Sequence, residues 1–497
     1  MTSAEQSERR TPHVSDPRVD RRRFIGCTGM ALAMGFAGLR SSAGDRRAAP
    51  KATRATRANA GWYGPLKKDP SGVLDLPEGF HYTAFSRFGE EMDDGLLVPA
   101  QHDGMSAFHL DERHCLLLRN HELNTNVAGR FGAFGLSNER LDRVDRALIY
   151  DLGTEQGAPV PGGVSTVLFD LEKNAPVKHW LSLAGTGHNC AGGPTPWGSW
   201  LSCEEWTQKR DGIHAKDHGY VFEVPASTRM GLVPAAPIKS MGRFLHEAVA
   251  VSPGGDAVYL TEDRGDGVLY RYLPNTPCDL AGGGRLQALM IQGRPGFDTR
   301  NWTTESGVTF LQGQSFATSW LDLEDIDAPE DDLRYRAFAK GAARFARGEG
   351  IWHGGDSVYW ACTTGGPAQL GQIFRYVPSP KEGTRGEREA PGRLELFVES
   401  GDEDLIGNAD NLTIAPNGDL FVCEDSAAQD GLSRITPSGE IERFATNRFN
   451  DSELAGVCFS PDGGTLFVNI QSPGTTFAIK GPWQKASHGS SDVPSPP

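Results

Sequence analysis

The chain has 497 residues, 38% of them hydrophobic, and a formal net charge of −15 from 49 Lys and Arg and 64 Asp and Glu. Nucleic-acid binders need a dense basic surface, so this acidic composition argues against a nucleic-acid partner. The 61 Gly and 32 Pro indicate many turns, and the 10 Trp and 24 Phe supply apolar bulk for a large core, in several domains or in one large closed β architecture.

Residues 1–60 have the features of an export signal. They are basic, with 12 Lys and Arg against 5 Asp and Glu. Arg21 and Arg22 lie in a twin-arginine pattern, and the weakly apolar run that follows, Phe24–Gly38, is too short to span a membrane. We therefore expect a signal and disordered linker over residues 1–60, recognition by the twin-arginine export machinery, and export to the periplasm, the cell surface or the medium.

Seven of the eight cysteines follow the predicted signal. An odd number leaves at least one thiol unpaired in an oxidising compartment. Five of the seven lie in apolar, strand-like runs, where buried free thiols are expected: Cys115, Cys203, Cys362, Cys423 and Cys458. Cys190 differs, because it lies in the polar, glycine-rich stretch Gly187–Gly193 and is therefore a candidate for another role.

Beyond residue 100 the sequence repeats a β-hairpin. Each unit has a tight turn, with Pro at its second position and Gly two residues later, followed by a short apolar strand. Four units share this turn, which begins at Thr195, Ser252, Ala415 and Ser460. A fifth unit, with its turn at Gly354, lacks the proline, and a sixth, more degenerate unit runs from Asp103 to Glu122.

Other segments alternate in the manner of outer strands, namely Gly219–Val224, Gly267–Leu273 and Gln372–Val377. Radially repeated four-stranded sheets are typical of a β-propeller. The sequence therefore predicts an all-β fold, a six-bladed β-propeller in a single domain over residues 61–480. Residues 481–497 are expected to form a disordered tail.

Each unit begins with a residue of a type that binds metals. Six residues before the turn proline stand Cys190, Glu247 and Asp410, and six residues before Gly355 stands Glu349. In the last unit the acid is Glu453, eight residues before its turn proline. The first unit starts at Asp103, and the units usually end in further acids, which are Glu122, Glu204, Glu205, Glu262, Asp263 and Asp425.

The geometry of a propeller gives this pattern a functional meaning. The inner strand of every blade lines a central channel, so equivalent strand ends from different blades meet on the axis. Carboxylates a few ångströms apart repel each other strongly, and only bound cations make such a cluster stable. The alternative is that each acid caps a turn on a solvated rim. Carboxylate oxygens suit Ca²⁺, whereas a thiolate among them calls for a transition metal, iron or zinc, so a mixed site is expected.

The run NCAGGPTPWGSWLSCEE, Asn189–Glu205, closely resembles the signature of the PhoX alkaline phosphatases, which are exported by the twin-arginine route. Shorter matches lie in the order in which the family has them: Asn120-His121-Glu122, His246-Glu247-Ala248-Val249, Arg347-x-Glu349, Asp410-Asn411, Glu453-Leu454-Ala455-Gly456 and Asn469-Ile470-Gln471. The resemblance covers residues 70–480.

This resemblance implies a six-bladed propeller with an Fe³⁺ and Ca²⁺ cluster on its axis that hydrolyses phosphate monoesters. It implies iron ligands at Cys190, Glu247 and Glu349, and calcium or bridging ligands at Glu122, Glu204 or Glu205, Asp410, Asp425 and Glu453. Arg347 resembles the arginine that holds the phosphate, so the predicted catalytic residues are Arg347, Cys190 and Glu349. Asn189 and Asn411 are expected to orient ligands or to touch the substrate.

Two departures from the family pattern bear on substrate range and metal set. Ser472 stands where a His is expected, and Leu123 follows Glu122 where an aromatic residue is expected. The chain is also shorter than the typical full-length phosphatases, and a propeller that has lost activity is one alternative.

Two further hypotheses are a calcium-dependent propeller hydrolase of the lactonase or phosphotriesterase type and a noncatalytic, calcium-stabilised binding propeller. Cys190 favours the phosphatase, because the lactonase-type sites need no thiolate. For the phosphatase we expect small phosphate esters as substrates, a monomer, and no stable membrane span.

Overall fold

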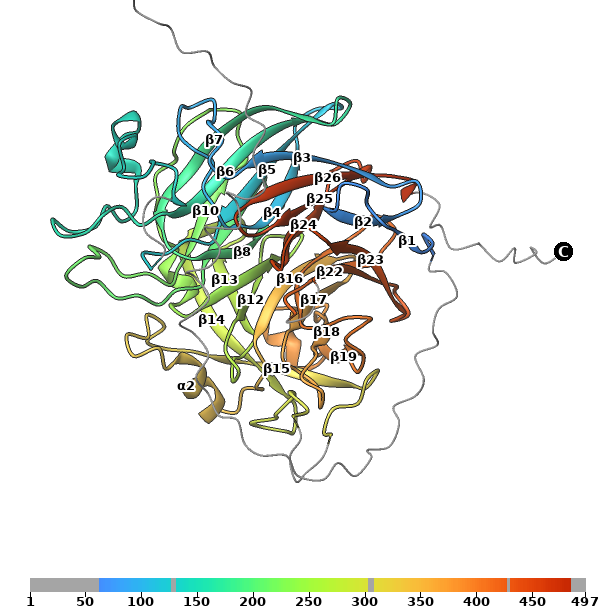
Figure 1. Ribbon diagram of the computed structural model, residues 1–497. Coiled ribbons are helices and arrows are strands. Elements are labelled where there is room, and N and C mark those ends of the chain that lie inside the picture. The colour runs from blue at the N-terminus through green and yellow to red at the C-terminus, as the bar shows by residue number, and fades with distance from the viewer. Residues whose placement is uncertain (1–61, 127–130, 303–307, 427–429, 484–497) are drawn as a thin grey trace, which may run out of the picture. The chain divides into compact units, whose positions relative to one another are not determined.

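Antiparallel β-strands are the main secondary structure, with a few short helices between them (Figure 1). The computed structural model describes residues 62–126, 131–302, 308–426 and 430–483. The predicted export signal with Arg21 and Arg22, and residues 484–497 of the predicted tail, lie outside the described residues. The all-β prediction is confirmed, and the predicted outer strands correspond to β10, β13 and β18.

The strands form six blades, each running outward from an inner strand. The first three blades are β4 (His102–His109), β5 (His114–His121), β6 (Gly162–Asp170) and β7 (Ala175–Thr186); then β8 (Asn189–Pro194), β9 (Ser199–Glu204) and β10 (Val221–Pro225); then β11 (His246–Val251), β12 (Val258–Glu262), β13 (Tyr270–Thr276) and β14 (Asp279–Ile291). The fourth is β16 (Gly348–Gly354), β17 (Ser357–Cys362), β18 (Gln372–Val377) and β19 (Arg393–Glu399), joined to the third through β15 (Ser315–Asp322).

The last two blades include strands from the N-terminal part of the chain. Blade 5 is β20 (Ala409–Ile414), β21 (Leu420–Glu424), β22 (Gly431–Ile435) and β23 (Ile441–Asn447), extended by β2 (Leu74–Pro77) and β1 (Leu66–Lys67). Blade 6 is β24 (Leu454–Phe459), β25 (Thr465–Ile470) and β26 (Thr475–Lys480), with β3 (His81–Arg87) as its outer strand. Because β3 precedes blade 1 in the chain and completes blade 6, it ties the first blade to the last.

The inner strands form a closed ring. Each packs against the next in the order β4, β8, β11, β16, β20 and β24, and β24 packs against β4. Six hydrophobic clusters lie in the corresponding places, each built mainly from two neighbouring blades. Burial of apolar surface between blades therefore holds the ring together. The predicted six-bladed β-propeller is confirmed.

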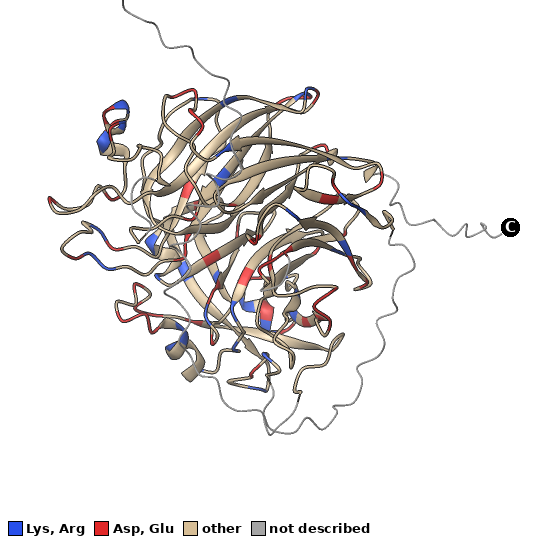
Figure 2. Ribbon diagram, viewed as in Figure 1, with Lys and Arg blue, Asp and Glu red and all other residues tan. Residues whose placement is uncertain are grey.

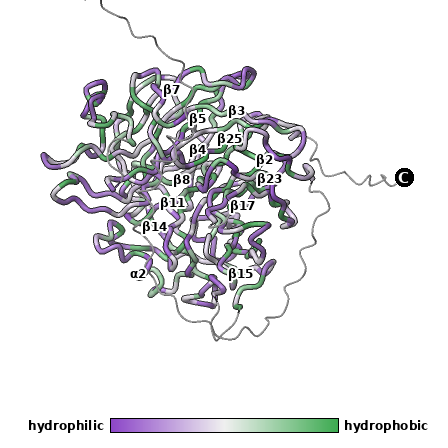
Figure 3. Tube along the Cα trace, in the orientation of Figure 1, coloured by the Kyte–Doolittle hydropathy of each residue, from purple (hydrophilic) through white to green (hydrophobic). Residues whose placement is uncertain are grey.

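The buried thiols belong to these interfaces. Cys115, Cys203, Cys362, Cys423 and Cys458 lie in the hydrophobic clusters and are free, as predicted. In Figure 3 the strands carry hydrophobic stretches, whereas many of the connecting loops are hydrophilic. The helical segments within the described ranges are α2 (Leu333–Ala339), η2 (Leu141–Arg143), η3 (Arg146–Leu148), η4 (Lys239–Met241) and η5 (Arg385–Arg388). None of the described helices has the length and apolar character needed to cross a membrane.

Candidate metal centre

All six inner strands carry a β-bulge; those of β4, β8, β11, β16 and β20 lie at the equivalent position, and that of β24 lies one residue nearer the turn. In β4 the pairing passes from His102 directly to Met105, so Asp103 and Gly104 lie opposite a single residue of β5. Such a bulge re-aims a side chain out of the regular alternation. The first bulge residues, from β4 to β24, are Asp103, Cys190, Glu247, Glu349, Asp410 and Gly456. Five of the six are ligand-type residues, of which the hairpin spacing singles out four and the fifth, Asp103, starts the degenerate unit.

The second bulge residue is glycine where inner strands approach each other closely. A Cβ added to Gly104 would lie 2.5 Å from the Cα of Ala191, and one added to Gly350 would lie 2.7 Å from the Cα of Asn411. No larger residue fits without a shift of the backbone. These glycines therefore allow neighbouring blades to bring their ligand side chains together.

Blade 6 supplies its acid in a different way. Its bulge residue is Gly456, with φ of +64°, and a Cβ there would collide with the carbonyl oxygen of Asp103. The acid comes instead from Glu453, which precedes β24 and lies beside Asp103 and Glu122. The residue six positions before the turn proline of this blade is Ala455, so the acid of blade 6 stands eight residues before that proline.

The acids and Cys190 form one continuous cluster, and Figure 2 shows acidic positions on the central strands. Within each of four groups the ligand atoms lie within 4.8 Å of one another. The groups are Glu122, His188 and Glu205; Cys190, Glu205 and Glu247; Asp103, Glu122 and Glu453; and Glu247, Glu349 and Asp410. Glu122, Glu205 and Glu247 each belong to two groups, so the four form a single cluster.

Burial and mutual repulsion control protonation in this cluster. Burial raises the pKa of Asp103 to about 7, and burial together with the charges of Asp103 and Glu205 raises the pKa of Glu122 to about 8. Burial and neighbouring carboxylates raise the pKa of further members well above the usual range, namely Glu247, Glu349, Asp410 and Glu453. Without a cation, the folded protein would therefore retain protons on several of these carboxyls at neutral pH.

Cys190 lies among the acids. Its Sγ is 3.2 Å from Oε1 of Glu247 and 3.7 Å from Oδ1 of Asp103. Burial, followed by the charges of Asp103 and Glu247, raises the pKa of the Cys190 thiol well above its usual value. The thiol therefore donates a hydrogen bond to Glu247, and only a cation at this position would favour the thiolate.

The donor set fits bound cations. Oε2 of Glu247 is buried and has no hydrogen-bond partner among the described residues. The carboxylate oxygens suit a hard ion such as Ca²⁺, and the combination of Cys190 with Glu247 suits a transition metal. A cluster of this charge would be costly to bury without cations.

Arg347 lies at the edge of the cluster. Its Nε and Nη2 donate to the two carboxylate oxygens of Asp263 at 2.8 and 2.9 Å, and Nη2 lies 3.0 Å from Oε1 of Glu349. Its side chain is 36% exposed, and its φ of +53° is unusual for a residue other than glycine. Asp263 therefore holds the guanidinium in a fixed orientation beside the cluster, and Nη1 takes no part in these contacts.

Two members of the site were not predicted. Nδ1 of His188 lies 3.2 Å from Glu122 and 3.4 Å from Glu205. Nε2 of Gln471 donates to Asp103 at 3.0 Å and to Glu122 at 2.6 Å. Gln471 stands in a matched motif and His188 directly precedes one, but neither is a carboxylate or thiol, the residue types on which the prediction relied.

The structure separates Glu205 from Glu204. Glu205 joins two groups of the cluster, whereas the carboxylate of Glu204 lies 2.6 Å from Nδ1 of His218 and also accepts backbone N–H groups. Glu204 is thus not among the grouped ligand atoms, because it points into its own blade. Asp425 is exposed and outside the four groups, although its charge helps to raise the pKa of Asp410.

The two asparagines are engaged by the protein itself. Asn189 accepts from the hydroxyl of Thr186 at 2.7 Å and donates to Ser202 at 2.8 Å. Asn411 donates to Asp410 at 3.1 Å and accepts from the backbone N–H of Gly456 at 2.6 Å. These contacts favour an orienting role for both residues rather than contact with a substrate.

The pKa shifts predict an unusual pH dependence of stability. The folded protein holds protons on Asp103 up to about pH 7 and on Glu122 up to about pH 8, whereas the unfolded chain releases them near pH 4. Protein stripped of metal should therefore lose stability as pH rises from about 4 to 8. We expect the Tm of EDTA-treated protein to fall between pH 5 and 8, and added Ca²⁺ to restore it most at pH 8. A Tm that is independent of pH and Ca²⁺ would contradict this interpretation of the acidic cluster.

Comparisons with known proteins give a family match and a solved structure with the same fold. The family model described as alkaline phosphatase PhoX matches residues 61–160 and 166–474. The structure of Pseudomonas fluorescens PhoX in complex with vanadate, a transition state analogue, has a TM-score of 0.60 and 19% identity over 84% of this chain and 98% of that chain. A gluconolactonase from Xanthomonas campestris has a TM-score of 0.38 and 12% identity over 84% and 98% of the two chains. No curated protein matches the chain.

Proposed function

The chain belongs to the alkaline phosphatase PhoX family, and we propose that it is an exported enzyme that hydrolyses phosphate monoesters at a centre of Fe³⁺ and Ca²⁺. The observation that carries this proposal is the cluster in which Cys190 and acids from all six blades bring their ligand atoms together. A thiol among carboxylates distinguishes this centre from one built for Ca²⁺ alone.

Within this proposal Cys190, Glu247 and Glu349 hold iron. Calcium or bridging contacts come from the remaining acids of the cluster, which are Asp103, Glu122, Glu205, Asp410 and Glu453, and Asp425 adds negative charge near Asp410. When bound, these metals would neutralise the phosphate charge and activate the attacking oxygen. The acids fix the metals, and Asn411, through its bonds to Asp410 and Gly456, keeps blades 5 and 6 in register.

Arg347 would bind the phosphate of the substrate. Its guanidinium is held by Asp263 and Glu349, so a nonbridging phosphate oxygen would meet a donor that is already oriented. Formally, residues 61–497 carry 37 Lys and Arg and 59 Asp and Glu, so the protein as a whole repels anions. Arg347 and the bound cations would reverse that field locally. Vanadate in the Pseudomonas fluorescens structure supports phosphoryl transfer as the reaction class.

The remaining features of the proposal come from the sequence. Arg21 and Arg22 would direct the chain to the twin-arginine machinery, and residues 61–480 would form a monomeric catalytic domain. Export in the folded state would allow the metals to be bound before or after transport.

A phosphatase assay tests this function. The exported protein should hydrolyse p-nitrophenyl phosphate in the presence of Ca²⁺, lose that activity on treatment with EDTA, and recover it when Ca²⁺ is restored. It should act poorly on lactones and on phosphotriesters. Lactone hydrolysis without phosphatase activity would support the lactonase-type alternative, and the absence of both activities would support a binding propeller.

A further inference from the structure

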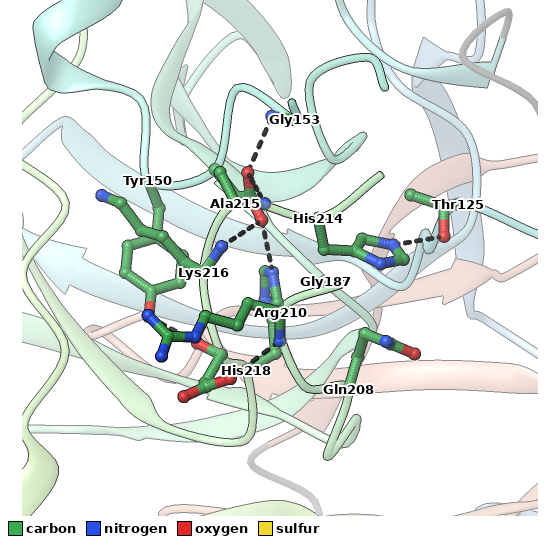
Figure 4. Close-up of polar contacts among 12 residues, drawn as sticks. Thr125, Tyr150, Gly153, Gly187, Gln208, Arg210, His214, Ala215, Lys216 and His218 are labelled. Atoms are coloured by element: carbon green, nitrogen blue, oxygen red, sulfur yellow. Dashed lines mark hydrogen bonds and ion pairs between the residues drawn. The ribbon is translucent and has the colours of Figure 1, made fainter. Parts of the chain in front are cut away.

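A second polar cluster lies beside the acidic centre, around the buried ring of His218 (Figure 4). Nδ1 of His218 is 2.6 Å from Oε1 of Glu204, and Nε2 is 3.3 Å from Oδ2 of Asp151. All three side chains are fully buried. The two ring nitrogens thus face carboxylates on two sides, and His218 bridges them as a donor.

Glu204 extends this cluster toward the metal centre. Its Oε1 also accepts the backbone N–H of Gly187 at 2.9 Å, and its Oε2 accepts those of Gly219 and Tyr220 at 2.9 and 3.2 Å. The ring of Trp206 covers Gly187 so closely that a Cβ there would collide with it. The same indole ring lies 4.9 Å from the ring of His218.

The residue after Gly187 has a backbone that needs such support. His188 has φ of +51°, which costs free energy for a residue with a Cβ and persists only where surrounding contacts fix it. Its N–H donates to Leu123 at 2.8 Å, and its C=O accepts from the N–H of Glu205 at 2.9 Å. The short connection Gly187–Cys190, which carries both His188 and Cys190 into the centre, is therefore held at three points.

Two other blades also have a glutamate at the end of the second strand, and there it bonds to a residue of the third strand of the same blade. Glu262, at the end of β12, accepts a hydrogen bond from Tyr270 of its own third strand at 2.9 Å. Glu424, at the end of β21, accepts from Ser433 of its own third strand at 2.7 Å. In blade 2 the corresponding Glu204 accepts hydrogen bonds from the segment before the third strand and also from Gly187. Glu204 and His218 are therefore linked to the connection that leads into β8.

From these contacts we infer that His218 is a positioning residue of the metal centre, which acts through Glu204 and Gly187 to hold His188 and Cys190 at the cluster. This inference rests on the proposed function, because the groups that are positioned are the metal and substrate groups of that centre. His218 itself touches neither. Asp151 anchors the far side of the ring and so fixes its direction.

Two substitutions of His218 separate this role from a purely structural one. The amide nitrogen of Asn takes the place of Nδ1, so His218→Asn retains the bond to Glu204. The amide nitrogen of Gln takes the place of Nε2, so His218→Gln retains the bond to Asp151 and loses the bond to Glu204. Both variants leave one carboxylate without its partner, and both keep a buried polar side chain of similar size.

The test is a Ca²⁺ titration followed by thermal unfolding, with iron content and kcat/KM measured on the same preparations. We expect His218→Gln to raise the Ca²⁺ concentration for half-maximal stabilisation by roughly 10- to 100-fold, as for other residues that orient metal ligands, and His218→Asn to raise it by less than about threefold. Tyr270→Phe, which removes the equivalent bond in blade 3, should leave the Ca²⁺ requirement within about twofold of wild type.

Each outcome decides the question. Equal Ca²⁺ requirements in the Gln and Asn variants would overturn the inference, as would a Gln variant that fails to fold while the Asn variant folds, because either result would show a structural role only. A wild-type protein that responds to Ca²⁺ and hydrolyses phosphate esters keeps the proposed function intact in those cases. If the wild type shows no Ca²⁺ response, the proposed function fails, and this inference fails with it.

Discussion

Replacement of Cys190 by Ser is expected to remove iron from the protein and to abolish phosphatase activity. The thiol lies 3.2 Å from Glu247 in the acidic cluster, and its position is fixed by the bulge in β8. A cation can turn this thiol into a thiolate ligand, whereas a serine hydroxyl is far more difficult to deprotonate. The folded propeller should survive the change, because Ser fits the space and retains a donor to Glu247.

Cys203 provides the matched control. It is also buried, but it lies in the hydrophobic cluster between blades 2 and 3. Cys203→Ser should lower the Tm, because it puts a hydroxyl into an apolar site, and should leave iron content and kcat/KM within about twofold of wild type. Equal losses of iron in the two variants would mean that Cys190 is not the ligand. Full activity in Cys190→Ser would contradict the assignment of the centre.

Arg347→Ala is expected to lower kcat/KM for p-nitrophenyl phosphate by roughly 10²- to 10³-fold. This is the usual effect of removing one oriented hydrogen-bond donor to the charge that develops in a transition state. The guanidinium is held by two bonds to Asp263 and by contact with Glu349, so its orientation is fixed before the substrate binds. Arg347→Lys keeps the positive charge but loses the planar, bidentate donor geometry of the guanidinium. It should therefore recover only part of the lost kcat/KM.

Arg264 is the control for this change. It is next to Asp263 in sequence, but its guanidinium pairs with Asp331 at 2.6 Å instead of with the cluster. Arg264→Ala should therefore retain activity within about threefold of wild type. If Arg347→Ala retained wild-type kcat/KM, the role proposed for Arg347 in phosphate binding would be wrong, whatever its effect on stability.

The fold was accessible from the sequence because the repeat is local. The turn and the strand after it are encoded in adjacent residues, such as Ser252–Gly255 and the apolar run that follows, so each hairpin could be recognised alone. The spacing of six residues from ligand to turn also had a local cause, because each ligand is the first residue of a bulge in the inner strand. Blade 6 breaks the spacing, since its bulge lies one residue nearer the turn and its acid, Glu453, precedes β24.

The parts that could not be predicted depend on contacts between distant residues. Glu204 and Glu205 are adjacent acids at the end of one strand, and only the position of His218 shows which of them points into the blade. His188 and Gln471 enter the site because Glu122, from another blade, lies beside both. The sequence does not show that the side chain of Asn189 is already hydrogen-bonded to Thr186 and Ser202.

The structure also gives the contacts of Leu123 and Ser472, the two residues that depart from the family pattern. Leu123 is fully buried, and its carbonyl accepts the N–H of His188, so its backbone supports the site whatever its side chain. Ser472 follows Gln471 and donates its N–H to Ser452 at 2.9 Å.

The central claim is that the acidic cluster on the propeller axis is a binding site for iron and calcium. Anomalous diffraction from crystals of the exported protein, recorded on both sides of the iron edge, tests this claim most directly. We predict an iron peak bounded by Cys190, Glu247 and Glu349, with calcium density beside Glu122, Asp410 and Glu453. Crystals of active enzyme with no metal at these residues would contradict it.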